Sequence, residues 1–350
     1  MTAPAALWVV PVSDLAGVAR HVLDVARAGL PGWRLAVLAP PGALCDRLRD
    51  LGAEVHEGPF GPDHGLRASV TTLRRVVRRV RPAVVHSHLA YADIVVALAA
   101  GRGPRLVTTE HGIARDDVVY HRSGTRTRAM AAVHTARLRR FDAAIAVSRA
   151  TADAMADKWH PRIPVKVVPN GVAPLAPRPP RAPGLRILSL ARLAPEKRLP
   201  ALLDAFAALR GDHPAARLTL AGTGPEEAAL RAHAHRLGLG DAVSLPGFVD
   251  PEPAMAEHDV LAMLSVWENC SYALLDAASR GMGVVASDVG GNPEVLPPVS
   301  LVDADDTAAV AAALARQGLD LSARPSLRDW PTVDDMCTRI TATYAAAGAR

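Results

Sequence analysis

Cysteines are few and long hydrophobic runs are missing in this chain of 350 residues. The three cysteines, Cys45, Cys270 and Cys337, are odd in number and far apart. That pattern argues against a disulfide framework or a zinc site, and it favours a reducing compartment, the cytoplasm. No segment reaches the roughly 18 uninterrupted apolar residues of a membrane span. Residues 1–13 lack the basic start of a signal peptide, so we expect a buried first strand there.

Aromatic residues and lysines are also scarce. Aromatics make up 4% of the chain and none is interleaved with the arginines, which argues against a nucleic-acid partner. Of the 40 basic residues only three are lysines, namely Lys158, Lys166 and Lys197. The net charge of +5 suggests an anionic partner without identifying it. A lysine beside other chemically useful residues therefore deserves a close look.

Short β-rich segments alternate with helical ones along the first half of the chain. The β-rich segments are residues 7–13, 34–40, 83–88, 105–111 and 143–148. Helical patterns, such as those at 17–29 and 69–81, lie between them. Repeated strand-then-helix order predicts an α/β fold built on a doubly wound parallel sheet.

A proline-rich segment divides the chain at residues 173–184, which contain five prolines. No helix or central strand tolerates that many, so we interpret the segment as a domain linker. The alternation of strand and helix then resumes, with strands expected at residues 185–191, 216–222, 259–264 and 283–288.

Two domains of similar size are therefore expected, at 1–172 and 185–325, facing each other across a cleft. In such sheets ligands bind at the carboxyl ends of the strands, so the loops that follow the strands should line that cleft. The tail, 326–350, predicts a C-terminal helix that packs back toward the first domain, with Trp330 and Tyr344 as anchors.

Arg192 and Lys197 lie five positions apart in a loop after a predicted strand of the second domain. Such a loop can bring both cations to one point, where a forked guanidinium beside an ammonium suits a diphosphate. The simpler interpretation is that both pair with Glu196 or with solvent, as arginines commonly do in an arginine-rich chain. The scarcity of lysine favours the diphosphate.

Gly17 stands where the first predicted strand turns into a helix. A glycine there lets the backbone approach a phosphate at a helix N-terminus, although a tight turn explains it equally well. The sequence has no GxGxxG, so a dinucleotide-binding fingerprint is not supported.

Three histidines occur near predicted strand ends. His111 is followed by a glycine and should point into the cleft, either bonding a ligand hydroxyl or serving as a surface or capping residue. His86 and His88 alternate along one strand, and we expect them to face opposite sides. That orientation disfavours a two-histidine metal site and favours structural roles.

Two carboxylates, Glu268 and Asp276, lie eight positions apart around an apolar segment. If a helix begins at Asn269–Ser271, its free N–H groups point into the same space. The carboxylates would then contact different parts of one long ligand rather than converge on a single bond as in a glycosidase. Carboxylates accept hydrogen bonds from paired hydroxyls, which a sugar and a ribose both offer. The alternative is that Asp276 is simply a polar residue on the solvent-facing side of an ordinary helix.

Arginines cluster in two sets. Arg74, Arg75, Arg78 and Arg79 share one predicted helix. The second set follows His111 and comprises Arg122, Arg126, Arg128, Arg137, Arg139 and Arg140. Either set could contact an anionic membrane surface or an acidic acceptor, but a solvated helix face is the interpretation we favour.

Taken together, these residues resemble the retaining glycosyltransferases of family 4, which have the GT-B fold of two Rossmann-like domains. The resemblance covers most of the chain and is strongest from 185 to 296. Glu268 and Asp276 match the family's two acidic residues, preceded by Ser265, and Arg192 and Lys197 match its cationic pair. The segments VVPNGV, LAGTGP, VSLPGFV and SDVGGNPEVL occur in the family's order, and LAGVARHV resembles its N-terminal glycine turn.

The resemblance implies a role for each matching residue. Arg192 and Lys197 would hold the donor diphosphate and stabilise the leaving nucleoside diphosphate, so that no metal and no cofactor is needed. Glu268 would bind sugar hydroxyls beside the amides of Asn269, Cys270 and Ser271, and Asp276 would bind the ribose. Gly17 would let a helix N-terminus meet the phosphate, His111 would touch the sugar or the acceptor, and backbone near Leu245 would recognise the base.

The resemblance thus predicts a cytoplasmic, retaining, metal-independent transferase of a hexose or N-acetylhexosamine from a nucleotide diphospho-sugar, most simply UDP-linked. The acceptor would be a small molecule or a glycan. This chain departs from the family at Asp276, which is usually Glu, and at Ala16, Ala191 and Gly283. Two alternatives stay open: an epimerase or phosphorylase on the same fold, and a non-catalytic sugar-nucleotide binding protein.

Overall fold

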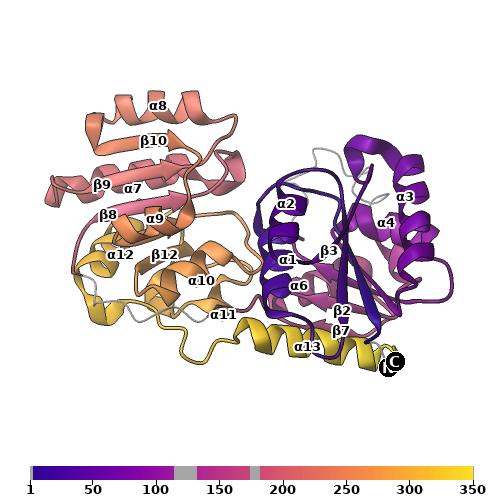
Figure 1. Ribbon diagram of the computed structural model, residues 1–350. Coiled ribbons are helices and arrows are strands. Elements are labelled where there is room, and N and C mark those ends of the chain that lie inside the picture. The colour runs from indigo at the N-terminus through magenta and orange to yellow at the C-terminus, as the bar shows by residue number, and fades with distance from the viewer. Residues whose placement is uncertain (1–2, 114–131, 174–181, 350) are drawn as a thin grey trace. The chain divides into compact units, whose positions relative to one another are not determined.

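The computed structural model describes residues 3–113, 132–173 and 182–349. The chain divides into two units, one of residues 1–173 with 331–350 and one of residues 174–330 (Figure 1). Each unit has its own sheet and its own hydrophobic core. No helix in the described part of the chain is both long and apolar enough to cross a membrane.

The first unit is built on a parallel sheet in the order β3-β2-β1-β4-β5-β6-β7. Its strands are β1 (Ala5–Val9), β2 (Arg34–Ala39), β3 (Glu54–Glu57), β4 (Val84–His88), β5 (Arg105–Glu110), β6 (Ala143–Ala146) and β7 (Val165–Val167). The central strand β1 is buried along its whole length, as expected for a strand covered by helices on both faces. The strand order reverses between β1 and β4, which marks the carboxyl end of this sheet as the place for a ligand.

Helices cover both faces of this sheet. On one face α1 (Gly17–Ala28), α2 (Ala43–Asp50) and α13 (Val333–Ala346) pack on residues such as Trp8 and Ile145. On the other face lie α3 (Gly65–Val80), α4 (Ala90–Ala99) and α6 (Arg149–Trp159). The C-terminal helix thus belongs to the core of the first unit.

The second unit has a parallel sheet in the order β10-β9-β8-β11-β12-β13. Its strands are β8 (Arg186–Leu190), β9 (Arg217–Ala221), β10 (Val243–Gly247), β11 (Val260–Met263), β12 (Gly283–Ser287) and β13 (Leu301–Val302). Its helices are α7 (Leu199–Asp212), α8 (Glu227–Arg236), α9 (Pro251–Glu257), α10 (Tyr272–Ser279), α11 (Asn292–Val295) and α12 (Thr307–Leu319). The strand order reverses between β8 and β11.

Two sequence predictions need correction at this level. The C-terminal helix begins only at Val333, because Thr332 and Asp335 form a capping box that starts it there. Tyr344 is fully buried as predicted, whereas Trp330 lies before the helix and is only partly buried. Most of the predicted proline-rich linker, residues 174–181, lies outside the described residues.

Candidate functional site

The loop after β8 carries the two predicted cations of the second unit. Lys197 ends a short 3₁₀ helix (Pro195–Lys197), and its Nζ lies 2.6 Å from Oε1 of Glu268 in a pair that is mostly buried. The guanidinium of Arg192 is 66% exposed and pairs with Glu196, as the simpler interpretation of the sequence supposed. The structure therefore joins two of the predicted site residues, Lys197 and Glu268, and leaves most of Arg192 open to a ligand.

Glycines fix the position of this cationic loop. The backbone N–H of Leu193 donates to Thr223 O at 2.9 Å, so the loop after β9 lies directly on the loop after β8. A Cβ at Gly222 would overlap the carbonyl oxygen of Ala191, and one at Gly224 would overlap that of Leu193. Larger residues in the AGTG segment would therefore push Arg192 and its neighbours out of place.

A second pair of glycines positions Glu268. The N–H of Gly291 donates to the carbonyl of Glu268 at 2.9 Å, and a Cβ at Gly290 would overlap that same carbonyl. Gly290 also has φ +54, a conformation that favours glycine. On the other side Val266 N donates to Glu196 O at 2.8 Å, which ties the segment of Glu268 to the loop of Lys197.

The helix after Glu268 starts later than the sequence predicted. Asn269 and Cys270 form a bend and Ser271 is the N-cap residue, so α10 begins at Tyr272 and these three residues precede its first turn. Asp276 is consequently about one turn inside α10. Its side chain is 15% exposed and its Oδ1 lies 3.5 Å from Nη1 of Arg280, so the alternative of a solvated Asp276 is wrong.

Leu245 lies in β10 at a point where the pairing with β9 is irregular. Its carbonyl accepts a hydrogen bond of 2.9 Å from Nη2 of Arg231, and its side chain packs against the core. The carbonyl oxygen of Leu245 therefore already has one hydrogen-bond donor within the protein.

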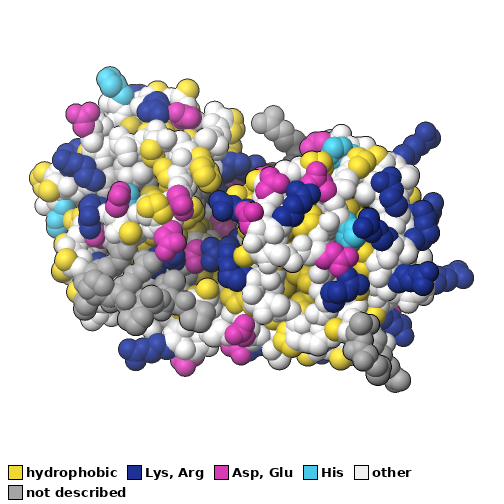
Figure 2. Space-filling model, in the orientation of Figure 1, with side chains coloured by type: hydrophobic (Ala, Val, Ile, Leu, Met, Phe, Trp, Pro, Cys, Tyr) yellow, Lys and Arg dark blue, Asp and Glu magenta, His cyan; other side chains and the backbone are white. Residues whose placement is uncertain are grey.

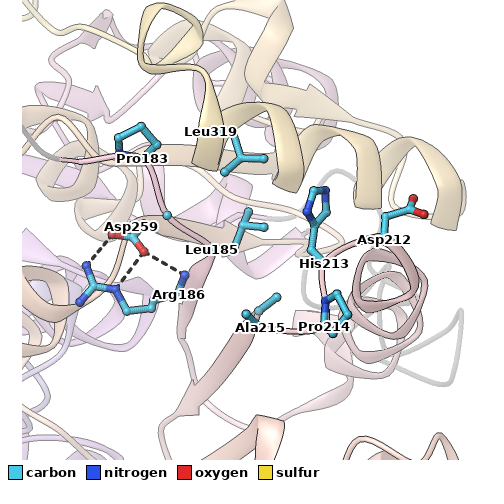
Figure 3. Close-up of a pocket in the computed structure, with 11 residues that line it drawn as sticks. Pro183, Leu185, Arg186, Asp212, His213, Pro214, Ala215, Asp259 and Leu319 are labelled. Atoms are coloured by element: carbon cyan, nitrogen blue, oxygen red, sulfur yellow. Dashed lines mark hydrogen bonds and ion pairs between the residues drawn. The ribbon is translucent and has the colours of Figure 1, made fainter.

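Two cavities lie at opposite ends of the second sheet. The larger, about 580 Å³, surrounds the amino end of β8, where Arg186 forms a bidentate pair with Asp259 (Figure 3). That pair satisfies the charges there, and ligands of parallel sheets bind at the opposite end. A cavity of about 390 Å³ lies at the carboxyl end and is lined by Ser265, Val266 and Asp288 among others. Ser265 and Val266 come shortly before Glu268 in the chain.

In the first unit, four histidines gather at the carboxyl end of the sheet. His86 and His88 face the same side of β4, with ring centroids 4.6 Å apart and stacked at 26°. The expectation that they face opposite sides is wrong, because residues two apart on a strand share a face. Nδ1 of His88 lies 2.9 Å from Nε2 of His111, and the ring of His21 on α1 lies 4.9 Å from that of His111.

The aromatic residues around this cluster fix the orientation of His86. Trp8 Nε1 can only donate, and it donates to the Tyr344 hydroxyl at 2.8 Å. The Tyr344 hydroxyl also lies 2.7 Å from Nδ1 of His86, and Nε2 of His86 lies 2.7 Å from Thr109 Oγ1, so both ring nitrogens of His86 have hydrogen-bond partners. His86 is thus structural, as the sequence favoured.

Burial keeps the clustered imidazoles uncharged. It lowers the pKa of His21 to about 4, although a hydrogen bond to Asn170 acts in the opposite direction. Burial, followed by the mutual repulsion of the rings, holds the pKa of His86, His88 and His111 well below the ordinary value. Neutral imidazoles both donate and accept, which suits contacts with hydroxyl groups.

A buried ion-pair network holds the end of β5 just before His111. Arg137 contacts Asp93 at 3.0 Å and Glu110 at 3.1 Å. Burial raises the pKa of Glu110 to about 7, although the guanidinium of Arg137 acts in the opposite direction. Arg137 is therefore an internal anchor and not part of a solvated face, which corrects the expectation for the second arginine set.

The remaining arginines of that set divide into two groups. Arg140 donates to the carbonyl oxygens of Ala97 and Gly101 at 3.3 and 2.9 Å, and Arg139 is exposed. Arg122, Arg126 and Arg128 lie outside the described residues.

Gly17 is the first residue of α1, as predicted, and Ala16 before it makes no side-chain cap. A Cβ at Gly17 would meet nothing within 4 Å, so the fold itself does not require a glycine there.

Sequence reasoning missed His21 and Asn170. Nδ1 of His21 lies 3.1 Å from Oδ1 of Asn170, which follows β7. Asn170 belongs to the segment VVPNGV, and His21 is one turn after Gly17 on α1. The rule that i and i+4 lie on one helix face would have placed His21 near the ligand end of α1.

Comparison with known proteins gives consistent matches along the chain. The family model described as Glycosyltransferase Family 4 matches residues 15–174, and that described as Glycosyl transferases group 1 matches residues 184–317. A glycogen synthase of Mycobacterium tuberculosis is 27% identical over 324 residues, which cover 83% of this chain and 78% of that protein. The putative colanic acid biosynthesis glycosyltransferase WcaL of Escherichia coli is 32% identical over 193 residues, 51% of this chain and 48% of that protein.

Among solved structures, HepE of Anabaena in complex with UDP-glucose matches with a TM-score of 0.82 at 20% identity, covering 98% of this chain and 100% of that one. A sucrose-phosphate synthase from Thermosynechococcus elongatus matches with a TM-score of 0.72 at 20% identity, covering 98% and 96%.

Proposed function

The chain belongs to the family 4 and group 1 glycosyltransferases and has the GT-B fold, and from that premise we propose that it transfers a hexose or N-acetylhexosamine from a UDP-sugar to an acceptor hydroxyl with retention of configuration. The observation that carries the proposal is the mostly buried pair of Lys197 and Glu268 beside the exposed guanidinium of Arg192. One ammonium and one guanidinium stand at the carboxyl end of the sheet, next to a carboxylate that can accept from sugar hydroxyls.

The proposed reaction breaks the bond between the anomeric carbon and the diphosphate oxygen. Arg192 and Lys197 stabilise the negative charge that develops on the leaving UDP, which is work that a metal ion does in other enzymes. The acceptor oxygen attacks from the face that UDP leaves, and the leaving phosphate takes the proton of the acceptor hydroxyl. The products are UDP and the glycoside, and the reaction uses no metal and no cofactor.

The other site residues receive their roles from the donor. Glu268, with the amides of Asn269, Cys270 and Ser271, would bind the sugar, and Asp276 would bind the ribose. Gly17 would admit a phosphate to the start of α1, His111 would contact the sugar or the acceptor, and backbone near Leu245 would recognise the base.

UDP is supported as the nucleotide by the similar solved structures. HepE was solved with UDP-glucose, and a pneumococcal O-GlcNAc transferase was solved with UDP and GlcNAc. The buried thiols of Cys45, Cys270 and Cys337 suit a reducing compartment, for which we propose the cytoplasm. We propose that the acceptor is a small molecule or a glycan, and we propose no nucleic-acid partner.

Calorimetry tests the donor. UDP, GDP and CDP, with their glucose and N-acetylglucosamine conjugates, are titrated into the protein with magnesium and with EDTA. We expect UDP compounds to bind at least tenfold more tightly than the others, with the same affinity in both buffers. Equal binding of all nucleotides, or binding that EDTA abolishes, would contradict the proposal. Recovery of an epimerised UDP-sugar instead of released UDP would favour the epimerase alternative.

A basic face on α3 supports contact with an anionic membrane surface. The helix contains no acidic residue, and six arginines on it or at its end are exposed and make no ion pair with a carboxylate of the described residues: Arg67, Arg74, Arg75, Arg78, Arg79 and Arg81. Figure 2 shows Lys and Arg side chains gathered on the side of the first unit where α3 lies. We propose that this face of the first unit attracts anionic lipid headgroups.

Vesicle sedimentation tests this contact. Each arginine near an anionic surface contributes about 1 kcal/mol, so the variant Arg74→Gln/Arg78→Gln should bind phosphatidylserine vesicles roughly 30-fold more weakly. The charge-matched variant Arg102→Gln/Arg316→Gln, which removes two exposed arginines elsewhere, should bind like the unmodified chain. Equal losses in both variants would show that only the net charge matters and would exclude a specific face.

A further inference from the structure

Three imidazoles from separate segments converge at the carboxyl end of the first sheet. His21 comes from α1, His88 from the end of β4 and His111 from the loop after β5, and one nitrogen of each lies within 4.8 Å of the others. We propose that these three histidines form a zinc-binding site that inhibits the enzyme. Zinc prefers imidazole nitrogens at about 2.0–2.1 Å, which places the ligands of a tetrahedral ion roughly 3.4 Å apart.

The observed geometry needs little adjustment to reach that arrangement. Nδ1 of His88 and Nε2 of His111 are already 2.9 Å apart, a separation at which one of them must carry a proton. The other nitrogen of His88 is buried and makes no hydrogen bond to the described residues. An ion between these rings would take the place of the shared proton and would bind Nδ1 of His88, the nitrogen that now contacts His111.

The surroundings of the three rings also suit a metal ion. Oδ1 of Asn170 lies 3.1 Å from Nδ1 of His21, and an oxygen that accepts from one ring nitrogen directs the other toward a metal. Trp8 packs under the cluster, with its ring 5.5 Å from that of His21 and 4.5 Å from that of His88. These contacts fix two of the three ligands before an ion arrives.

The third ligand provides the entry path. His21 and His88 are almost fully buried, whereas His111 is partly exposed, so an ion reaches the site past His111. Three histidines leave the fourth position of zinc open to water or an anion. Zinc takes no part in the proposed transfer. Instead it would occupy His111 and prevent its contact with the sugar or acceptor, a consequence that rests on the proposed function, whereas binding itself does not.

Metal titration tests the site. The full-length protein, stripped with EDTA and then freed of it, is titrated with zinc against a chromophoric chelator, and cobalt is used in parallel for its absorption spectrum. We expect one zinc per chain and a cobalt spectrum of a four-coordinate site. His111→Gln should weaken zinc binding at least 30-fold, and Asn170→Ala should weaken it about tenfold, since loss of such a partner costs 10–100-fold. His64→Gln, which changes an exposed histidine of the same unit, should bind like the unmodified protein.

Three results would overturn the assignment. They are zinc binding that is absent, zinc binding that His111→Gln leaves unchanged, and a cobalt spectrum of an octahedral surface ion. His111 is partly exposed, so this variant should fold, which thermal unfolding verifies; His88→Gln provides a second variant.

The inhibitory role has a separate readout. Release of UDP from a UDP-sugar should fall at least tenfold when the site is filled, and EDTA should restore it. Zinc that binds at one equivalent without slowing UDP release would leave the metal site standing and overturn the inhibition, because His111 would then not contact the reactants. Absence of UDP release without zinc would contradict the proposed function and not the metal site.

Discussion

Replacing Lys197 by alanine should lower kcat/KM for UDP release from the donor sugar by a factor of 10 to about 100. A hydrogen bond to a charged group contributes about 1.5–3 kcal/mol, and every 1.4 kcal/mol corresponds to a tenfold change. The ammonium of Lys197 lies 2.6 Å from Glu268, so the substitution also leaves that carboxylate, 14% exposed, without its partner. Both effects act on the donor, one on the leaving diphosphate and one on the sugar-binding residue.

Two further variants separate these effects. Lys197→Arg keeps the positive charge but changes its shape, and it should restore part of the activity. Lys166→Ala removes an exposed lysine on β7 and should behave like the unmodified enzyme. If Lys197→Ala folds normally and its kinetics are unchanged, the assignment of this loop to the diphosphate is wrong.

The strands of both sheets could be predicted wherever they are fully buried. β1 and β12, for example, are buried at every position, and each appears in the sequence as a continuous run of apolar or small residues. The sequence does not predict the four edge strands of the two sheets, β3, β7, β10 and β13. They are short or only half-buried, so their sequences carry no strong apolar pattern.

Side-chain pairing was harder to predict than the strands. Lys197 and Glu268 are 71 positions apart, and only the adjacency of β8 and β11 brings their loops together. Local charge spacing favoured Glu196 as a partner, and Arg192 does pair with it. A charge pattern along a sequence therefore identifies near partners, whereas the partner of Lys197 follows from the topology of the sheet.

The histidine cluster shows a different kind of failure. The sequence points to His86, His88 and His111, but the expectation that His86 and His88 face opposite sides of the strand is wrong, and it disfavours a metal site for that reason alone. With the correct period, His86 and His88 share a face, and β5 is next to β4 in the sheet. Only the contribution of His21 required the three-dimensional packing of α1.

Gly283 illustrates how the structure explains a departure from the family. The family usually has proline there, yet the N–H of Gly283 donates to Asp259 O at 2.9 Å, a bond that proline cannot make. A Cβ at this position would also overlap the carbonyl oxygen of Gln317. The glycine therefore suits this chain's own packing of β12 against α12.

Acid should destabilise the first unit. The pKa of His21 is about 4 in the folded protein and about 6.5 in the unfolded chain, so the unfolded chain binds the proton first as the pH falls. The stability that depends on neutral His21 is therefore complete above pH 6.5 and is lost as the pH falls toward 4, a loss of about 3 kcal/mol. His86, His88 and His111 have pKa values shifted in the same direction and add to this loss.

Two acids in the same region act in the opposite direction. Burial raises the pKa of Glu110 to about 7 and also raises that of Asp93, so their contribution to stability grows as the pH falls. Arg137 contacts both carboxylates and limits that gain. Four histidines therefore act against two partly compensated acids, and the net stability of the first unit should fall between pH 6.5 and 4.5.

Unfolding in denaturant, followed at several pH values in the presence of EDTA, measures this slope. One neutral buried histidine contributes up to about 1.4 kcal/mol per pH unit, so His21→Gln should reduce the slope by that amount whatever it does to stability at pH 7. His64→Gln, at an exposed position, should keep the slope unchanged. A slope between pH 6.5 and 4.5 that is the same in His21→Gln as in the unmodified chain would mean that the cluster accepts protons in the folded state, since the two acids act equally in both proteins. In that case the rings could not be packed as tightly as the 4.6 Å separation of His86 and His88 requires.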